Sequence, residues 1–232
     1  MLHIQTFEAF EFKKKRKIKK HIKDERGGVV NIMSRISDKK KGNLPELLEN
    51  VSKRFDVKII KYQNCGAFGM AFIADNNKVI KLTSEKSEAA NVKALIGKRV
   101  PGCLDYYDIV YSRKYDIYCI LMERVQILSK KEELLYNAVL DAFDYVTKPR
   151  EIYYVNFVLD ALDGEFTRDE IKKAVNLVTD LKRKLQSAGV DTRDLHTGNM
   201  GWRGKELVHF DIMSDATKQD DIDKISKIKK GR

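Results

Sequence analysis

The stretch Asp194-Leu-His-Thr-Gly-Asn199, followed by Leu207-Val-His-Phe-Asp211, decides how the rest of the chain is interpreted. It places a carboxylate and a carboxamide at opposite ends of a short loop and a second carboxylate at the end of the next apolar run. Carboxylate and amide oxygens are ligands that Mg²⁺ takes, commonly together with phosphate oxygens. Asp194, Asn199 and Asp211 are therefore predicted to form a site for a metal-bound phosphate.

A long helix is predicted immediately before this loop. Thr167-Arg-Asp-Glu170 has the form of a capping box, in which hydroxyl and carboxylate each satisfy a backbone donor, and Gly189 can end the helix. Between them, apolar residues recur at helical spacing: Ile171, Ala174, Val175, Val178, Leu181 and Leu185. This helix would deliver the chain to the loop.

A small hairpin is predicted after the loop. Residues 200–202 and 205–210 have the character of two short strands, joined at Arg203-Gly204. Such a hairpin would carry Asn199 at one end and Asp211 at the other.

The first half of the chain is predicted to alternate short strands with two helices. The strands are expected at 57–62, 70–73, 78–82, 108–112 and 116–122. One helix is expected to open at Asn43-Leu-Pro-Glu46, with Asn43 as its cap and an apolar face of Leu44, Leu47, Leu48 and Val51. The other is expected at 84–96, with Ala89, Val92, Leu95 and Ile96 buried. Beyond Val125 the chain is expected to turn helical, at 130–147 and 150–162. This order predicts an α+β protein.

The loop resembles a known catalytic segment. Arg193-Asp-Leu-His-Thr-Gly-Asn199 resembles the catalytic loop of the protein-kinase-like superfamily, and Phe210-Asp211-Ile212 resembles its Asp-Phe-Gly metal-binding segment. In that family the first Asp accepts the proton of the attacking hydroxyl, while the Asn and the second Asp hold magnesium ions that bridge the nucleotide phosphates. The resemblance implies these roles for Asp194, Asn199 and Asp211, with ATP and Mg²⁺ as cofactors.

The resemblance also implies a fold and its division. It implies a two-lobed kinase-like fold, with a small five-stranded antiparallel β lobe that includes one helix, a reduced and mainly helical C-lobe, and ATP between them. The expected parts are a basic arm at 1–42, a nucleotide-binding lobe at 43–125 and a truncated catalytic lobe at 126–232. Residues 212–232 leave no room for the activation segment of ordinary protein kinases, so the chain resembles minimal members such as RIO-type kinases.

The segment Asn64-Cys-Gly66-Ala67-Phe68-Gly69 resembles the glycine-rich loop that covers nucleotide phosphates. Glycines matter there because backbone N–H groups must approach phosphate oxygens without an intervening Cβ. Asn64 stands at the position of the first glycine. A glycine-containing hairpin turn explains the same residues equally well.

Lys81 resembles the strand lysine that contacts the nucleotide phosphates, and Glu88 resembles its ion-pair partner on the following helix. The alternative for Lys81 is an ordinary exposed strand lysine. Glu85 competes with Glu88, but Glu88 lies about two turns before Leu95, as in the family pattern.

The segment from Leu121 to Val125 resembles the kinase hinge. The resemblance implies that main-chain groups at Glu123 and Val125 bind the adenine edge and that Met122 occupies the gatekeeper position. The alternative is a core strand that runs into a loop.

Two histidines lie near the predicted site. His196 makes the loop similar to those of aminoglycoside and choline kinases, where it would steady the γ-phosphate; the alternative is packing beside Asp194. His209 is expected to be structural.

Composition limits the class of protein. The chain has 232 residues with 43% hydrophobic content, a net charge of +11 and three cysteines without a Cys-x-x-Cys pair. These features predict a cytoplasmic protein with a real core and no disulfide framework, and no membrane association is expected. The basic clusters at 13–21 and 224–232 are either solvated ends or contacts for nucleic acid or an acidic partner.

The function predicted from these features is ATP-dependent phosphoryl transfer by an atypical serine/threonine protein kinase. One alternative is a small-molecule kinase of the aminoglycoside or choline type. Another is a catalytically silent adaptor that binds nucleic acid or an acidic protein through its basic ends.

Overall fold

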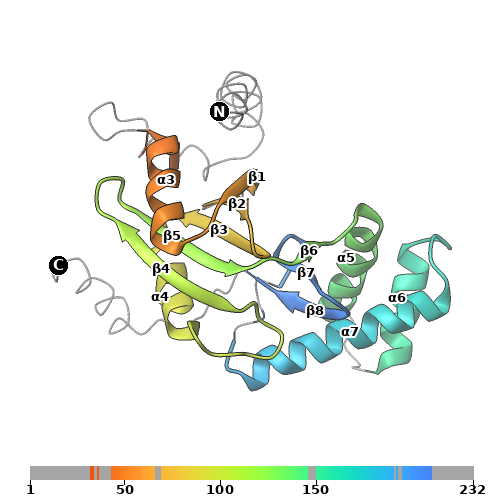
Figure 1. Cartoon of the computed structure of the whole chain (residues 1–232). Coiled ribbons are helices and arrows are strands. Elements are labelled where there is room, and N and C mark those ends of the chain that lie inside the picture. The colour runs from red at the N-terminus through yellow and green to blue at the C-terminus, as the bar shows by residue number, and fades with distance from the viewer. Residues whose placement is uncertain are drawn as a thin grey trace. The chain divides into compact units, whose positions relative to one another are not determined.

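The computed structural model describes residues 32, 33, 36, 43–65, 69–145, 150–190, 192 and 195–210, without the side chains of residues 64 and 65 (Figure 1). Its described residues form two compact units. One takes in the chain up to Ala89 together with Asp108–Met122, and the other takes in Ala90–Tyr107 and the chain from Glu123. Predictions for the basic arm and for Gly66, Ala67, Phe68, Asp194 and Asp211 lie outside the described residues.

A five-stranded antiparallel sheet contains the predicted strands. Its strands are β1 (Ile59–Cys65), β2 (Gly69–Ala74), β3 (Lys78–Thr83), β4 (Tyr106–Ser112) and β5 (Ile117–Glu123), in the order β1-β2-β3-β5-β4. The turn between β2 and β3 has φ values of 52° at Asn76 and 56° at Asn77. Asparagine tolerates this left-handed conformation, and two such residues suit a tight hairpin.

Helix α3 (Leu44–Phe55) packs on this sheet and closes the core of the first unit. Its N-cap is Asn43, whose side chain accepts a hydrogen bond from the Glu46 N–H at 2.9 Å. The buried face meets apolar side chains of the sheet; the core includes Leu47, Leu48, Val51, Phe55, Phe72, Ile80, Leu82, Ile117 and Leu121. The predicted cap is confirmed, and so is the apolar face, in which Leu44 is only partly buried.

Helix α4 (Lys86–Leu95) is the helix expected at 84–96. Its buried residues are Glu88, Ala89, Ala90, Asn91 and Val92, whereas Leu95 and Ile96 are only half-buried. The expected stripe is therefore wrong at its C-terminal end. The apolar pattern misplaced the face because two of the buried side chains, Glu88 and Asn91, are polar.

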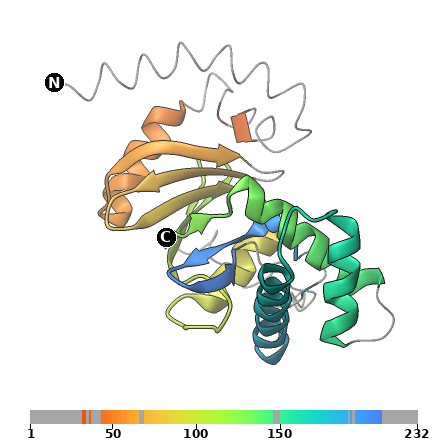
Figure 2. The same ribbon diagram turned by 90° about the vertical axis from the view of Figure 1, so that its right-hand side faces the viewer.

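Helices α5 (Lys130–Tyr145), α6 (Glu151–Ala161) and α7 (Arg168–Ser187) pack against one another in the second unit (Figure 2). The capping box at Thr167 is confirmed: its side chain accepts from the Glu170 N–H, and the Glu170 carboxylate accepts from the Thr167 N–H at 2.8 Å. All six predicted stripe residues of α7 are buried. The chain turns away after it at Gly189, with φ of 71°.

A three-stranded sheet of order β6-β7-β8 completes the second unit, with β6 (Gln126–Ile127), β7 (Met200–Arg203) and β8 (Glu206–His209). The predicted hairpin is confirmed. The helices expected at 130–147 and 150–162 are present as α5 and α6, but the sequence did not predict the two-residue strand β6, which pairs with β7. The close approach depends on Gly201, where a Cβ would lie 2.8 Å from Val125 Cγ2.

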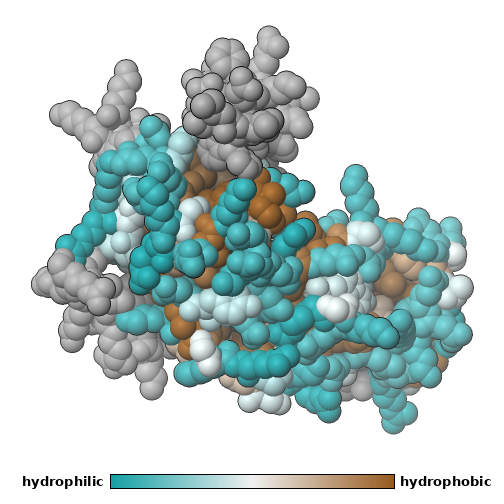
Figure 3. All heavy atoms as spheres, in the orientation of Figure 1, coloured by the Kyte–Doolittle hydropathy of each residue, from teal (hydrophilic) through white to brown (hydrophobic). Residues whose placement is uncertain are grey.

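The predicted α+β class, with a five-stranded antiparallel sheet ahead of a mainly helical part, is confirmed. Hydrophilic residues cover most of the face over α6 and α7 (Figure 3). Within the described residues, no helix combines the length and apolar character that a membrane span needs.

Cys103 and Cys119 are free and buried, and burial raises the pKa of each thiol to about 12. Neither thiol is therefore a ready nucleophile.

Candidate active site

The structure brings Lys81 and Glu88 together inside the first unit. Lys81 lies on β3 and its side chain is 15% exposed, while Glu88 lies in the first turn of α4 and its side chain is 8% exposed. Lys81 Nζ is 2.5 Å from Glu88 Oε1. Lys81 is therefore not an ordinary exposed strand lysine, and Glu88 is the carboxylate that pairs with it.

This pair has a specific electrostatic consequence. Two opposite charges that are largely removed from water attract strongly, and the fixed carboxylate limits where the ammonium group can lie. An ammonium carries three donors, so it can serve more than one acceptor. The pair thus holds a cation at a defined place beside the start of β2.

Gly69, the last residue of the predicted glycine loop, lies close to the backbone of Leu82 and the side chain of Lys81. It opens β2, and a Cβ on it would lie 2.6 Å from the Leu82 carbonyl oxygen and 3.2 Å from Lys81 Cε. The first distance is a collision with backbone, which cannot move cheaply. Gly69 is therefore required for the close approach of β2 and β3, and the Lys81 stem passes over it.

The substitution Gly69→Ala tests this close approach. Without a collision, alanine in a strand would raise stability by about 0.5–1 kcal/mol, because glycine has more conformational freedom to lose on folding. We expect the opposite sign, a loss of about 1–3 kcal/mol, since an overpacked site must shift backbone. Urea denaturation measures the difference, and a variant as stable as the parent would show that the two strands can separate at no cost.

The second predicted part of the site lies on the turn η1 (Thr197–Asn199). Asn199 is buried, with 8% of its surface exposed. Its N–H donates to the His196 carbonyl at 2.9 Å, and its carbonyl accepts from the Phe210 N–H at 2.9 Å. Asn199 is thus fixed at the end of the β7–β8 hairpin, opposite the residue that directly precedes Asp211 in sequence.

The two histidines are in different environments. His196 is exposed, and its ring lies beside Gly198, where a Cβ would be 2.9 Å from His196 Cε1. His209 is fully buried in β8, and its backbone N–H donates to the Gly102 carbonyl at 2.8 Å. His196 is therefore the imidazole that can meet a ligand from solvent, and the burial of His209 fits the structural role expected for it.

The side chains predicted to hold Mg²⁺ can be compared with what the ion requires. Both backbone groups of Asn199 are already hydrogen-bonded, so its carboxamide oxygen is the group that it can contribute. Among the described residues no three His, Cys, Asp or Glu side chains gather as a metal cluster, and Asp211 lies outside them. One amide and one carboxylate oxygen, with phosphate oxygens and water, match the hard oxygen ligands that Mg²⁺ prefers.

The predicted hinge divides between the two units, with buried Met122 in the first and Glu123 and Val125 in the second. The Glu123 N–H donates to the Asp105 carbonyl at 2.9 Å. The residues after it form β6, which pairs with β7 at Gln126–Trp202 and Ile127–Gly201. The segment proposed to contact adenine is therefore joined by backbone pairing to the hairpin that carries Asn199.

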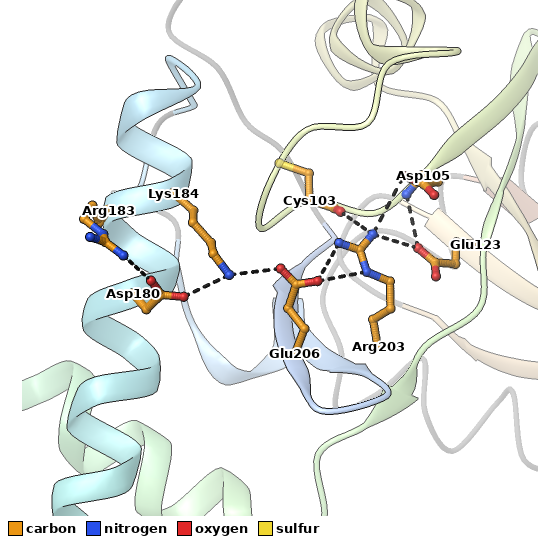
Figure 4. Close-up of polar contacts among 8 residues, drawn as sticks. All are labelled: Cys103, Asp105, Glu123, Asp180, Arg183, Lys184, Arg203 and Glu206. Atoms are coloured by element: carbon orange, nitrogen blue, oxygen red, sulfur yellow. Dashed lines mark hydrogen bonds and ion pairs between the residues drawn. The ribbon is translucent and has the colours of Figure 1, made fainter.

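A network around Arg203, for which the sequence predicts only a place in a turn, also braces this hairpin (Figure 4). Its guanidinium donates to Glu206 at 2.9 Å, to the Cys103 carbonyl at 3.2 Å and to Glu123 at 3.3 Å. Asp105 lies 3.7 Å away. The sequence offers one signal for this network, an arginine three residues before a glutamate across a hairpin turn. The other partners, Cys103, Asp105 and Glu123, are 80 or more positions away.

The network extends from the hairpin to α7. Lys184 lies 3.1 Å from Glu206 and 2.9 Å from Asp180 (Figure 4). Burial would raise the pKa of Glu206, but its hydrogen bonds with Arg203 and Lys184 outweigh that effect and lower it. Within the second unit, the hairpin is thus tied by charge to α7 on one side and to Asp105 and Glu123 on the other.

No protein-family model matches the chain, and no curated protein matches it. Among solved structures, the kinase domain of PknI from M. tuberculosis is similar, at 13% identity and a TM-score of 0.39. The match covers 69% of this chain and 59% of that chain, so it spans less than two thirds of the kinase domain.

Proposed function

We propose that this protein is an ATP-dependent phosphotransferase of the protein-kinase-like type, which transfers the γ-phosphate of ATP to a hydroxyl group. The observation that carries the proposal is the ion pair between Lys81 and Glu88, at 2.5 Å and largely removed from water. Burying two charges gives little net stability compared with apolar side chains of similar volume. A chain that keeps such a pair on a strand and the following helix, upstream of the Asp194 loop, fits a phosphate-binding task.

Each residue has a proposed role in this reaction. Lys81 binds the phosphates and Glu88 orients Lys81, while residues 64–69 cover the phosphates and the main chain at Glu123 and Val125 binds the adenine edge. Asp194 orients the acceptor hydroxyl and accepts its proton. Asn199 and Asp211 hold Mg²⁺, which when bound neutralises charge on the phosphate oxygens. Catalysis of this kind consists mainly of positioning and charge stabilisation.

The acceptor is proposed to be a serine or threonine hydroxyl of a protein. The net charge of +11 favours an acidic protein or nucleoprotein partner, since a basic surface attracts one at long range. A small hydroxyl compound is the second candidate, and the exposed imidazole of His196 beside Gly198 is the observation that favours it.

The proposal is tested by transfer of labelled γ-phosphate from Mg-ATP. Acceptors are the protein itself, an acidic and a basic model protein, an aminoglycoside and choline. We expect label on at least one acceptor with the parent chain, and none after chelation of Mg²⁺. If nucleotide binds but no acceptor gains label, the activity is absent and a nucleotide-binding adaptor is the better description.

The substitution Asn199→Ala is expected to raise the Mg²⁺ concentration for half-maximal transfer by about 10- to 100-fold, because it removes a proposed metal ligand. Its control is Asn156→Ala, which removes an exposed carboxamide on α6 whose oxygen accepts a surface hydrogen bond from Arg168. Titration of Mg²⁺ at fixed ATP gives both values. An unchanged Mg²⁺ requirement in Asn199→Ala would remove Asn199 from the metal site.

A further inference from the structure

The turn that carries Asn199 is attached to helix α5 through side chains. Thr197 is buried, and its hydroxyl donates to Asn137 Oδ1 at 2.9 Å, across 60 positions of sequence. Asn137 projects from the middle of α5, and α5 packs against η1. This hydrogen bond is therefore a direct link between the helix and the turn, two residues before Asn199.

A second link from the same helix meets the chain on the other side of Asn199. The Trp202 indole N–H donates to Glu132 Oε1 at 2.9 Å. Glu132 is itself fixed in the first turn of α5, where its other carboxylate oxygen accepts from the N–H and the hydroxyl of Ser129, each at 2.7 Å. Trp202 also packs edge-on against Tyr136 of α5. Asn199 thus lies between two positions, Thr197 and Trp202, that α5 holds in place.

The backbone of Asn199 is already fixed by the His196 carbonyl and the Phe210 N–H. The Thr197 hydroxyl bond adds a third restraint to the same turn, made by a side chain of α5 two residues before Asn199. A ligand held a fraction of an ångström from its best place binds a metal more weakly, since supporting hydrogen bonds govern ligand orientation.

We propose that Thr197 and Asn137 are positioning residues that fix the Asn199 carboxamide for metal binding, with α5 as their rigid support. This inference rests on the proposed function, since it gives the pair a task only if Asn199 holds a metal. Neither side chain acts on the reacting atoms. Their effect is on how tightly the metal is held, and it is transmitted through the turn.

The test compares Thr197→Val, which keeps the shape and removes the hydroxyl, with Thr197→Ser, which keeps the hydroxyl. The probe is Mn²⁺, titrated by electron paramagnetic resonance in the presence of a non-hydrolysable ATP analogue. We expect Thr197→Val to raise the Mn²⁺ dissociation constant about 10-fold and Thr197→Ser to restore it close to the parent value. Transfer by Thr197→Val should recover at saturating Mg²⁺.

Two further variants separate positioning from general loosening. Asn137→Ala should weaken Mn²⁺ binding like Thr197→Val, and the double variant should be no worse than either single one, since both remove the same hydrogen bond. Thr179→Val is the matched control: it also removes a threonine hydroxyl from the second unit, but one that donates to the Val175 carbonyl at 2.7 Å within α7. It should leave Mn²⁺ binding unchanged.

The outcomes are distinguishable from failure of the proposed function. If the parent chain binds no Mn²⁺ with the nucleotide analogue and transfers no phosphate, the proposed function fails and this inference fails with it. If the parent binds Mn²⁺ and Thr197→Val binds it equally well, only the positioning role is overturned. If Thr179→Val weakens binding as much as Thr197→Val, the effect is general loosening and the positioning role is likewise overturned.

Discussion

Replacing Lys81 by methionine is expected to lower phosphoryl transfer by about 10²- to 10³-fold, the usual cost of removing one preorganised charge or donor from a reacting site. Methionine matches the lysine stem in length and fits a side chain that is only 15% exposed. The substitution therefore removes the ammonium with little change in packing. The initial rate of labelled γ-phosphate transfer at saturating Mg-ATP measures the effect.

This substitution also leaves Glu88 without the cation beside it, so a loss of stability must be separated from a loss of catalysis. An uncompensated charge at a site only 8% exposed destabilises the folded state. The double variant Lys81→Met/Glu88→Gln removes both charges, and we expect it to regain stability but not activity. Lys61→Met, at an exposed position of β1, is the control. Recovery of transfer in the double variant would mean that Lys81 acts only on the fold.

The local signals in the sequence were sufficient for most of the fold. The capping box at Thr167 and the apolar stripe of α7 each act over a few residues, so they can be identified without tertiary information. Strand β6 could not be identified in the same way. It has two residues, too few for a pattern, and it forms because Gly201 of β7 lets the backbone come close.

The candidate site also combines features that the sequence predicted with features that it did not. The pairing of Lys81 with Glu88 was predicted from the resemblance to the kinase-like family, in which a strand lysine pairs with a glutamate of the next helix, and the structure contains that pair. The hydrogen bond of Thr197 to Asn137 spans 60 positions and that of Arg203 to Glu123 spans 80, and neither has a local signature. Sequence patterns thus find groups that meet a ligand more readily than the groups that hold them in place.

Replacing Arg203 by methionine is expected to lower the free energy of unfolding by about 3–5 kcal/mol, the cost of removing one partner from a buried charge network. The guanidinium is 15% exposed and lies within 3.7 Å of three carboxylates, those of Glu123, Asp105 and Glu206. Of these, Glu206 would retain Lys184, but the substitution removes the cation that Glu123 and Asp105 share. Arg203→Lys should recover only part of the loss, because an ammonium lacks the planar fork that serves several acceptors.

The expected loss depends on pH with a definite sign. The pKa of Glu206 is lowered in the folded protein by its bonds with Arg203 and Lys184, against the effect of burial. Its contribution to stability is therefore complete above the unfolded value of about 4.3 and disappears as pH falls through the lower folded value. Urea denaturation should show the full difference between parent and Arg203→Met at pH 7 and a smaller one below about pH 4.

The control for Arg203→Met is Arg183→Met, which breaks an ion pair whose arginine is 76% exposed and should lower the free energy of unfolding by at most about 1 kcal/mol. Equal losses for the two variants would show that the Arg203 network is no stronger than a surface ion pair.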